Sequence, residues 1–265
     1  MRDPHVQALY FNASSDVGTA YQPTASLSFE NALGKFEVAA NGLKCIPAED
    51  FSSREAARAA IEPFLQAWEI STDLVDRFGA LRFSYERADV VDRSPPPAGT
   101  LQAIQAEGFI SFAAGGSVVA TAVLNEYPKP PSGFEATSTV AMCYRRWMKF
   151  KAGKEPLQAM AYFVLSVVET AAKEHISGGA KVRTKASRMF CVDEEVLSTI
   201  ANYASARGGE ESARKADPKG AYADLTAAET AWLDHATRVL IRRIGEHAAG
   251  AEMKRVSLRD LPHIQ

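Results

Sequence analysis

The chain has 265 residues, which is long enough for one large domain or two smaller domains that each bury a hydrophobic core. Hydrophobic residues make up 46% of the sequence and charged residues 23%, the composition of an ordinary globular protein, and this excludes wholesale disorder. The net charge of −2, averaged over the whole chain, argues against a polyanion as partner.

The cysteines and the apolar segments indicate the compartment. Cys45, Cys143 and Cys191 are odd in number and far apart, a pattern that favours reduced thiols in a cytoplasm over a disulfide framework. The N-terminus lacks the long apolar region of a secretory signal. The longest apolar run, residues 159–168, is about half of the roughly 20 residues that a membrane span requires. We therefore expect a cytoplasmic protein with no membrane segment.

Residues 1–130 are predicted to form a β-rich domain with one inserted helix. Asn41-Gly42 separates two short alternating segments and predicts a tight hairpin turn, because both residues tolerate positive φ angles. Apolar and polar residues alternate over residues 80–91, which is typical of a half-buried strand. Residues 101–112 and 117–127 are two further strand candidates.

The inserted helix is predicted to begin at a capping box. The hydroxyl of Ser52 can accept a hydrogen bond from an early backbone N–H, and Glu55 can reach back to the cap. Apolar residues then recur at helical spacing through Trp68. Pro63 lies in the middle of this pattern and predicts a kink or a break into two short helices.

Proline and small residues between Pro128 and Ser138 are typical of a linker, which we place at residues 131–138. The period becomes helical in residues 139–265, where we expect an α-helical bundle. One helix is predicted from about Arg183 to Arg207, and another begins at a capping box formed by Thr226 and Glu229. The fold class is therefore α+β: a β-rich N-terminal domain with one inserted helix, followed by an α-helical bundle.

Charge is spread unevenly along the chain. Residues 141–188 carry a net charge of +7, whereas residues 1–140 carry −7 and residues 189–265 carry −2. A basic central segment of this kind can form an electrostatic footprint for nucleic acid. It can equally dock on the acidic N-terminal half or on another subunit. The sequence leaves both interpretations open.

Two parts of the basic segment supply candidate phosphate contacts. Residues 144–154, YRRWMKFKAGK, interleave cations with Tyr144, Trp147 and Phe150, so the cations can neutralise phosphates while the aromatic rings stack on bases. In the alternative interpretation, the aromatic rings form the buried face of a short helix and the cations its solvated face. Residues 181–188 add four cations at what is more often a solvated helix start. The candidate nucleic-acid-binding residues in these two parts are Arg145, Arg146, Lys149, Lys151, Lys181 and Arg183.

Motifs for metals and cofactors are missing from the sequence. The five histidines show no HxxxH or HExxH spacing and have no cysteine nearby, so we expect no metal site. The chain has no Walker A motif, no GxGxxG after a strand and no GxSxG elbow, so we expect no cofactor.

The order of elements in the C-terminal half resembles that of a known protein family. A helix with a late glutamate, Glu169, precedes a second long helix, which is followed by the polar stretch RKADPKG at 214–220 and by a closing helix. Over roughly residues 140–250, this order resembles the HEPN family of helical, RNA-associated domains. The family signature is an arginine, a polar residue, a few variable residues and a histidine, often followed by glycine. Arg214, Lys215 and Gly220 match this signature, and Lys219 stands where the histidine belongs.

The resemblance implies RNA binding without cleavage. In family members that cut RNA, the histidine and the arginine handle the proton and the phosphate, usually across a dimer. A lysine ammonium with an ordinary pKa of about 10 is a poor general base at neutral pH but a good phosphate contact. The resemblance therefore implies a non-catalytic homodimer that binds RNA or a protein partner through Arg214, Lys215 and Lys219, in a conflict or defence system.

Two alternatives remain open. Arg242 or Arg243 with His247 could act as a metal-independent ribonuclease, because Arg243 and His247 are four residues apart and share a helix face. Arg242 and Glu246 have the same spacing, so a plain helical ion pair explains the pattern equally well. The third hypothesis is an interaction or scaffold protein with no nucleic-acid role.

Overall fold

The structure, a computed structural model, describes residues 3–15, 19–22, 24–75, 78–94, 122–175, 179–206 and 224–263. The chain divides into two compact units, Met1–Pro130 and Pro131–Gln265, called here the sheet unit and the helical unit. An antiparallel sheet followed by helices confirms the predicted α+β class. The strand candidate at 101–112 and the first part of that at 117–127 lie outside the described residues.

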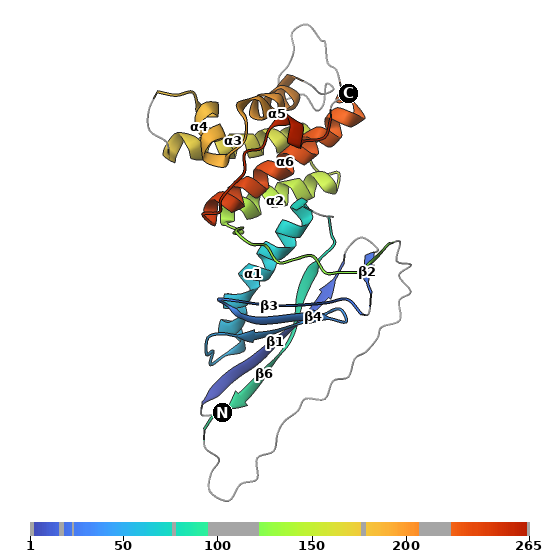
Figure 1. Cartoon of the computed structure of the whole chain (residues 1–265), viewed down its shortest axis with the longest axis vertical. Coiled ribbons are helices and arrows are strands. Elements are labelled where there is room, and N and C mark those ends of the chain that lie inside the picture. Colours follow the sequence, from blue (N-terminus) through green and yellow to red (C-terminus); the bar gives the residue numbers. More distant parts are fainter. Residues whose placement is uncertain are drawn as a thin grey trace, which may run out of the picture. The chain divides into compact units, whose positions relative to one another are not determined.

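The sheet unit is built on a five-stranded antiparallel sheet with the strand order β3-β4-β5-β1-β6 (Figure 1). The strands β2 and β7 form a separate parallel pair. The strand bounds are β1 (Pro4–Ser14), β2 (Thr19–Tyr21), β3 (Ser26–Asn31), β4 (Gly34–Ala39), β5 (Gly42–Pro47), β6 (Arg82–Asp92) and β7 (Ala122–Leu124). The last of the predicted alternating segments, residues 80–91, coincides with β6 and is confirmed as a strand.

The β4–β5 hairpin turns one residue earlier than the sequence predicts. Ala40 and Asn41 both have positive φ angles, 48° and 63°, and Ala39 pairs with Gly42 across the turn. A two-residue loop with positive φ at both positions is the type I′ turn that matches the twist of the flanking strands. The predicted hairpin is therefore correct, and Gly42 belongs to the strand rather than to the turn.

The helix α1 (Arg54–Val75) packs across one face of the sheet (Figure 1). Ile61, Leu65 and Trp68 are buried in a core that they share with the strands. The predicted break at Pro63 does not occur, and α1 is one continuous helix. Proline removes a single backbone hydrogen bond, and the buried residues on both sides of it hold the two halves against the sheet.

The N-terminus of α1 uses a different cap from the predicted one. The hydroxyl of Ser53, rather than that of Ser52, accepts a hydrogen bond of 3.2 Å from the backbone N–H of Ala56. Glu55 pairs with the Arg54 guanidinium at 2.7 Å. Two consecutive serines make the sequence signal ambiguous by one residue, and this one-residue shift replaces the predicted capping box by a simple cap.

The helical unit contains α2 (Ser138–Lys151), α3 (Leu157–His175), α4 (Val182–Phe190), α5 (Glu194–Ala206), α6 (Ala227–Ala248) and the short 3₁₀ helix η1 (Leu258–Asp260). The central helix α3 packs against each of the other four α-helices. Trp147 on α2 and Trp232 on α6 are fully buried in the core of the unit. None of the helices in the described ranges has the length and hydropathy of a membrane span.

The single helix predicted for residues 183–207 is wrong, because the chain forms α4 and α5 with a break between them. Cys191 adopts a left-handed conformation with a φ of 51°. Val256, in the C-terminal segment, then pairs with Val192, donating to the carbonyl of Cys191 and accepting from the N–H of Asp193, each at 2.8 Å. This pairing supplies partners for backbone groups that a continuous helix would use internally.

The capping box of α6 is confirmed. The Thr226 hydroxyl accepts from the N–H of Glu229 at 3.2 Å, and the Glu229 carboxylate accepts from the N–H of Thr226 at 2.8 Å. Both partners lie three residues apart, so the local sequence alone determines this helix start.

Candidate functional site

Three exposed cations lie at the C-terminal half of α2 and just after it. Arg145 and Lys149 are one helical turn apart on the exposed face of α2. Lys154 follows in the turn after the helix, where its N–H donates to the carbonyl of Lys149 at 2.8 Å. Across the parts of the chain that the structure describes, none of the three forms an ion pair. Arg145, Lys149 and Lys154 are called the α2 cation group below.

Arg146, the next predicted phosphate contact, is half-buried, and its guanidinium already has partners within the helical unit. Its guanidinium pairs with the carboxylate of Glu155, which precedes α3. The same guanidinium lies 4.2 Å from the ring centroid of Phe163 on α3. These two contacts attach α2 to α3, so Arg146 has a structural role.

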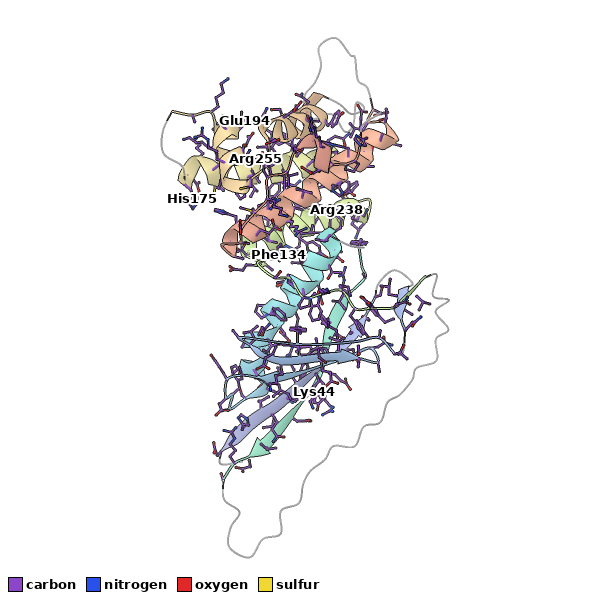
Figure 2. All side chains as sticks on the ribbon, viewed as in Figure 1. Lys44, Phe134, His175, Glu194, Arg238 and Arg255 are labelled. Atoms are coloured by element: carbon purple, nitrogen blue, oxygen red, sulfur yellow. The ribbon has the colours of Figure 1, made fainter. Side chains whose placement is uncertain are left out.

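The aromatic residue at the centre of the basic segment is buried. Only 1% of Trp147 is exposed, and its indole N–H donates to Asp234 on α6 at 2.7 Å. Lys151 and Arg238, the latter labelled in Figure 2, each place a nitrogen 3.9 Å from the same carboxylate. Trp147 therefore cannot stack on a base, and for this ring the interpretation as a buried helix face is confirmed.

The second predicted basic part lies on another helix. Arg183 on α4 pairs with Glu169 on α3 at 2.9 Å, and Lys181 immediately before α4 is exposed. The helix α4 packs against α3, α5 and α6, whereas α2 packs against α3 and α6. The two basic parts of the sequence are therefore carried by different helices and form no continuous helix face (Figure 1).

The two arginines of the ribonuclease alternative are also held in ion pairs. Glu246 is buried and accepts from Arg242 and from Arg243, each at 2.6 Å. His247 is exposed and packs edge-on against Phe190, with ring centroids 5.3 Å apart. Within the described contacts, no hydrogen bond joins His247 to either arginine. The helical ion pair that the spacing of Arg242 and Glu246 allows is therefore present.

The stretch 214–220, on which the family resemblance rests, lies outside the described residues. Arg214, Lys215 and Lys219 all fall within residues 207–223, for which the structure gives no description. Their role as phosphate contacts stays a prediction.

Sequence reasoning missed the carboxylates that neutralise three of the six predicted cations that the structure describes. Glu169 and Asp234 each pair with a cation on another helix, and Glu155, in the segment between α2 and α3, pairs with a cation on α2. One local signal was present, because Asp234 and Arg238 are four residues apart on α6 and share a helix face. The pairs between different elements depend on tertiary packing and leave no such spacing.

Neither the described side-chain clusters nor the comparisons with known proteins indicate a particular reaction. Over the described ranges, no group of three or more His, Cys, Asp or Glu side chains is placed to hold a metal ion. Burial raises the pKa of Cys45 and of Cys143 to about 12, so neither thiol supplies a thiolate near neutral pH. Comparisons with protein-family models, with curated proteins and with solved structures found no match to this chain.

Proposed function

We propose that the chain is a non-catalytic RNA-binding protein whose helical unit contacts the phosphate backbone through the α2 cation group. The main support for the proposal is that Arg145 and Lys149 are exposed and lie one helical turn apart. Among the described residues, neither of them forms an ion pair. Such cations can approach a phosphate without first losing a carboxylate partner, and each contact releases counterions from the RNA. The other cations of α2 already face carboxylates.

The family resemblance supports RNA over other polyanions. The resemblance to the HEPN family covers roughly residues 140–250, with α4 and α5 in place of its single second helix, and Arg214, Lys215 and Lys219 are further proposed phosphate contacts within it. Residues 131–265 contain 20 Lys and Arg against 16 Asp and Glu, a net charge of +4 that attracts a polyanion. The resemblance also implies a homodimer, in which two α2 cation groups would contact the same RNA molecule.

Binding of this kind would be independent of the base sequence. Phosphate contacts set affinity and position, whereas base recognition requires contacts to base edges or stacking on aromatic rings. The indole of Trp147 is buried in the core and hydrogen-bonded to Asp234, so it supplies no surface on which a base can stack. We therefore expect similar affinities for single-stranded RNAs of different sequence.

The test compares two double variants with the same change in charge. Arg145→Ala/Lys149→Ala removes two members of the α2 cation group, and Lys35→Ala/Arg54→Ala removes two exposed cations of the sheet unit. Binding to a fluorescent single-stranded RNA at low salt is measured by anisotropy. We expect the α2 variant to bind roughly tenfold more weakly and the control within about twofold of the wild type, because only the first loses phosphate contacts.

Two results would contradict the proposal. An equal loss of affinity in both variants would mean that overall charge, rather than α2, determines binding. No binding by the wild type at low salt would leave the helical unit as a protein-interaction module. The same preparation, incubated with total RNA and EDTA, tests the non-catalytic part, since cleavage that disappears in His247→Ala would instead support the ribonuclease alternative.

A further inference from the structure

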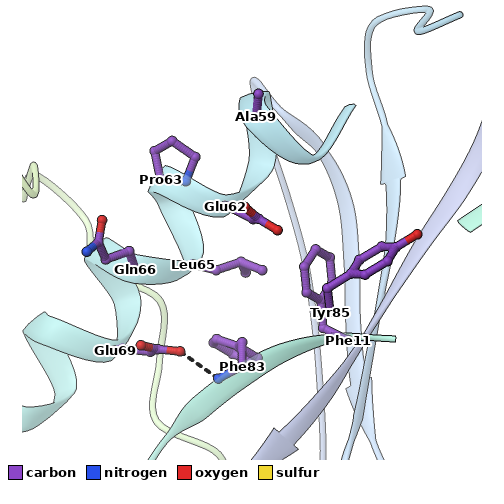
Figure 3. A pocket seen from close by; sticks show the side chains of 9 residues that line it. All are labelled: Phe11, Ala59, Glu62, Pro63, Leu65, Gln66, Glu69, Phe83 and Tyr85. Atoms are coloured by element: carbon purple, nitrogen blue, oxygen red, sulfur yellow. Dashed lines mark hydrogen bonds between the residues drawn. The ribbon is translucent and has the colours of Figure 1, made fainter. Parts of the chain in front are cut away.

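A pocket of about 460 Å³ lies in the sheet unit between α1 and the strands β1 and β6 (Figure 3). Its volume is within the range of about 300–1,000 Å³ that is common for small-molecule sites. The strands contribute the rings of Phe11, Phe83 and Tyr85, and α1 contributes the carboxylates of Glu62 and Glu69. Figure 3 shows the Glu62 carboxylate pointing from α1 toward Phe11 and Tyr85.

The polar groups of this pocket are mostly hydrogen-bond acceptors. Among the described residues, those that line it include two carboxylates and no lysine, arginine or histidine. Glu69 is held in the wall by the backbone N–H of Phe83, which donates to its Oε1 at 2.6 Å. The surrounding unit, residues 1–130, has 10 Lys and Arg against 16 Asp and Glu, so its net charge of −6 favours cations.

The proline in α1 adds a further acceptor at the same place. Pro63 has no N–H, so the carbonyl of Ala59 lacks the donor that a helix normally supplies from four residues ahead. Ala59 and Pro63 both line the pocket. A ligand that donates hydrogen bonds can therefore meet a backbone carbonyl as well as the carboxylates.

Arg58 shows how a guanidinium binds at the edge of this pocket. Its Nε donates to Glu62 Oε1 at 2.7 Å, and its guanidinium carbon lies 4.1 Å from the ring centroid of Tyr85. An aromatic face beside a carboxylate is the arrangement by which proteins recognise organic cations. Among the described contacts, Glu62 Oε2 accepts no hydrogen bond and is available to a second cation.

We propose that this pocket binds an alkylguanidinium or alkylammonium group, with the cation at Glu62 and the aliphatic stem against Phe11, Phe83 and Tyr85. The group can belong to a free small molecule or to an arginine or lysine side chain of a partner protein. The site lies in the sheet unit, and its function is separate from RNA binding by the helical unit.

The ligand class is tested on the full chain by titration with butylguanidinium, butylammonium and the neutral butylurea, followed by backbone amide NMR. We expect both cations to cause saturable shifts in α1 and at the start of β6, and butylurea to cause none, because the site selects for charge. A tripeptide, acetyl-Gly-Arg-Gly-amide, identifies the source. Tighter binding of the peptide than of butylguanidinium supports a partner's side chain, and tighter binding of butylguanidinium supports a free small molecule. Equal binding of butylurea, or no saturable shift with any cation, would overturn the proposal.

Two substitutions on α1 should act in opposite directions. Glu62→Gln removes a charge-assisted hydrogen bond and should weaken butylguanidinium binding roughly five- to tenfold. Arg58→Gln removes the internal competitor for Glu62 and for the face of Tyr85, and should tighten binding by about threefold. Glu37→Gln, which alters the opposite face of the sheet, is the control and should change nothing. Damage to the fold would weaken binding in both α1 variants, so weaker binding by Arg58→Gln, or unchanged binding by Glu62→Gln, would refute the proposed site.

Discussion

His235 on α6 is held in its neutral form by its surroundings. Burial lowers the pKa of its imidazole below the ordinary value, the positive charge of Arg238 lowers it further, and Asp234 opposes both effects. The Arg238 guanidinium lies 3.1 Å from the Nδ1 atom, and because arginine can only donate, Nδ1 accepts this hydrogen bond. Protonation of Nδ1 would replace the hydrogen bond by repulsion between two cations.

The helical unit should therefore lose stability in mild acid. The folded pKa of His235 lies below the unfolded value of about 6.5, so the unfolded chain takes up the proton first. The contribution of His235 is complete above pH 6.5 and is lost as the pH falls through this value toward the folded pKa. Urea denaturation of the wild type and of His235→Gln, between about pH 7.5 and pH 5, measures the effect.

We expect the wild type to lose stability relative to His235→Gln as the pH falls, because glutamine has no proton to gain. Parallel profiles, or a wild type that gains stability relative to His235→Gln on acidification, would contradict the neutral assignment of this histidine.

At the scale of elements, a glycine allows the segment before α2 to cross α6. A methyl group on Gly245 would lie 2.4 Å from the ring carbon Cε2 of Phe134 and 3.0 Å from the carbonyl oxygen of Glu135. The N–H of Glu135 also donates to the carbonyl of Gly245 at 3.1 Å. The close approach of these two backbones is possible because Gly245 has no side chain.

Gly245→Ala should destabilise the helical unit by about 1–3 kcal/mol, because overpacking outweighs the roughly 1 kcal/mol that alanine gains over glycine inside a helix. In a Phe134→Ala background, the ring is gone and most of this loss should disappear. Chemical denaturation of the four proteins of this double-mutant cycle measures the coupling. A Gly245→Ala variant that is more stable than the wild type would show that the crossing segment does not pack as described.

The elements that the sequence predicted correctly depend on local contacts. Thr226 and Glu229 are three residues apart and form their capping box without help from the rest of the fold. The helix break at Cys191 was missed because it depends on the pairing of Val192 with Val256, far along the chain. The sequence around Cys191 does not indicate this partner. Periodicity finds helices and strands, whereas their interruptions depend on contacts between distant segments.

The candidate site, like the fold, could be predicted from the sequence only where it depends on local spacing. On α2, Val140, Cys143 and Trp147 are buried at helical spacing, so the exposure of Arg145 and Lys149 follows from the sequence. The neutralisation of other cations by carboxylates on neighbouring elements does not follow from it. Sequence reasoning therefore identified a basic segment correctly but could not separate its exposed members from its paired members.

At the scale of the whole molecule, charge is divided between the two units. Residues 1–130 have a net charge of −6 and residues 131–265 a net charge of +4, although the total is only −2. These net charges agree with the proposals of a polyanion as ligand of the helical unit and an organic cation as ligand of the sheet unit. The near-neutral total is therefore the sum of two units with opposite net charge, and we expect substitutions in one unit to leave ligand binding by the other unchanged.

The salt dependence of RNA binding tests whether the α2 cation group contacts phosphates. If the three members of the α2 cation group contact phosphates, each chain that binds the RNA through this group should contribute about −2 to the slope of log K against log salt concentration, in addition to any contribution from Arg214, Lys215 and Lys219, since each contact to a single strand contributes about −0.7. Arg145→Ala/Lys149→Ala should flatten the slope by about 1.4 for each bound chain, because each chain loses two contacts. A slope that is the same in this variant and in the wild type would show that RNA binds elsewhere on the chain.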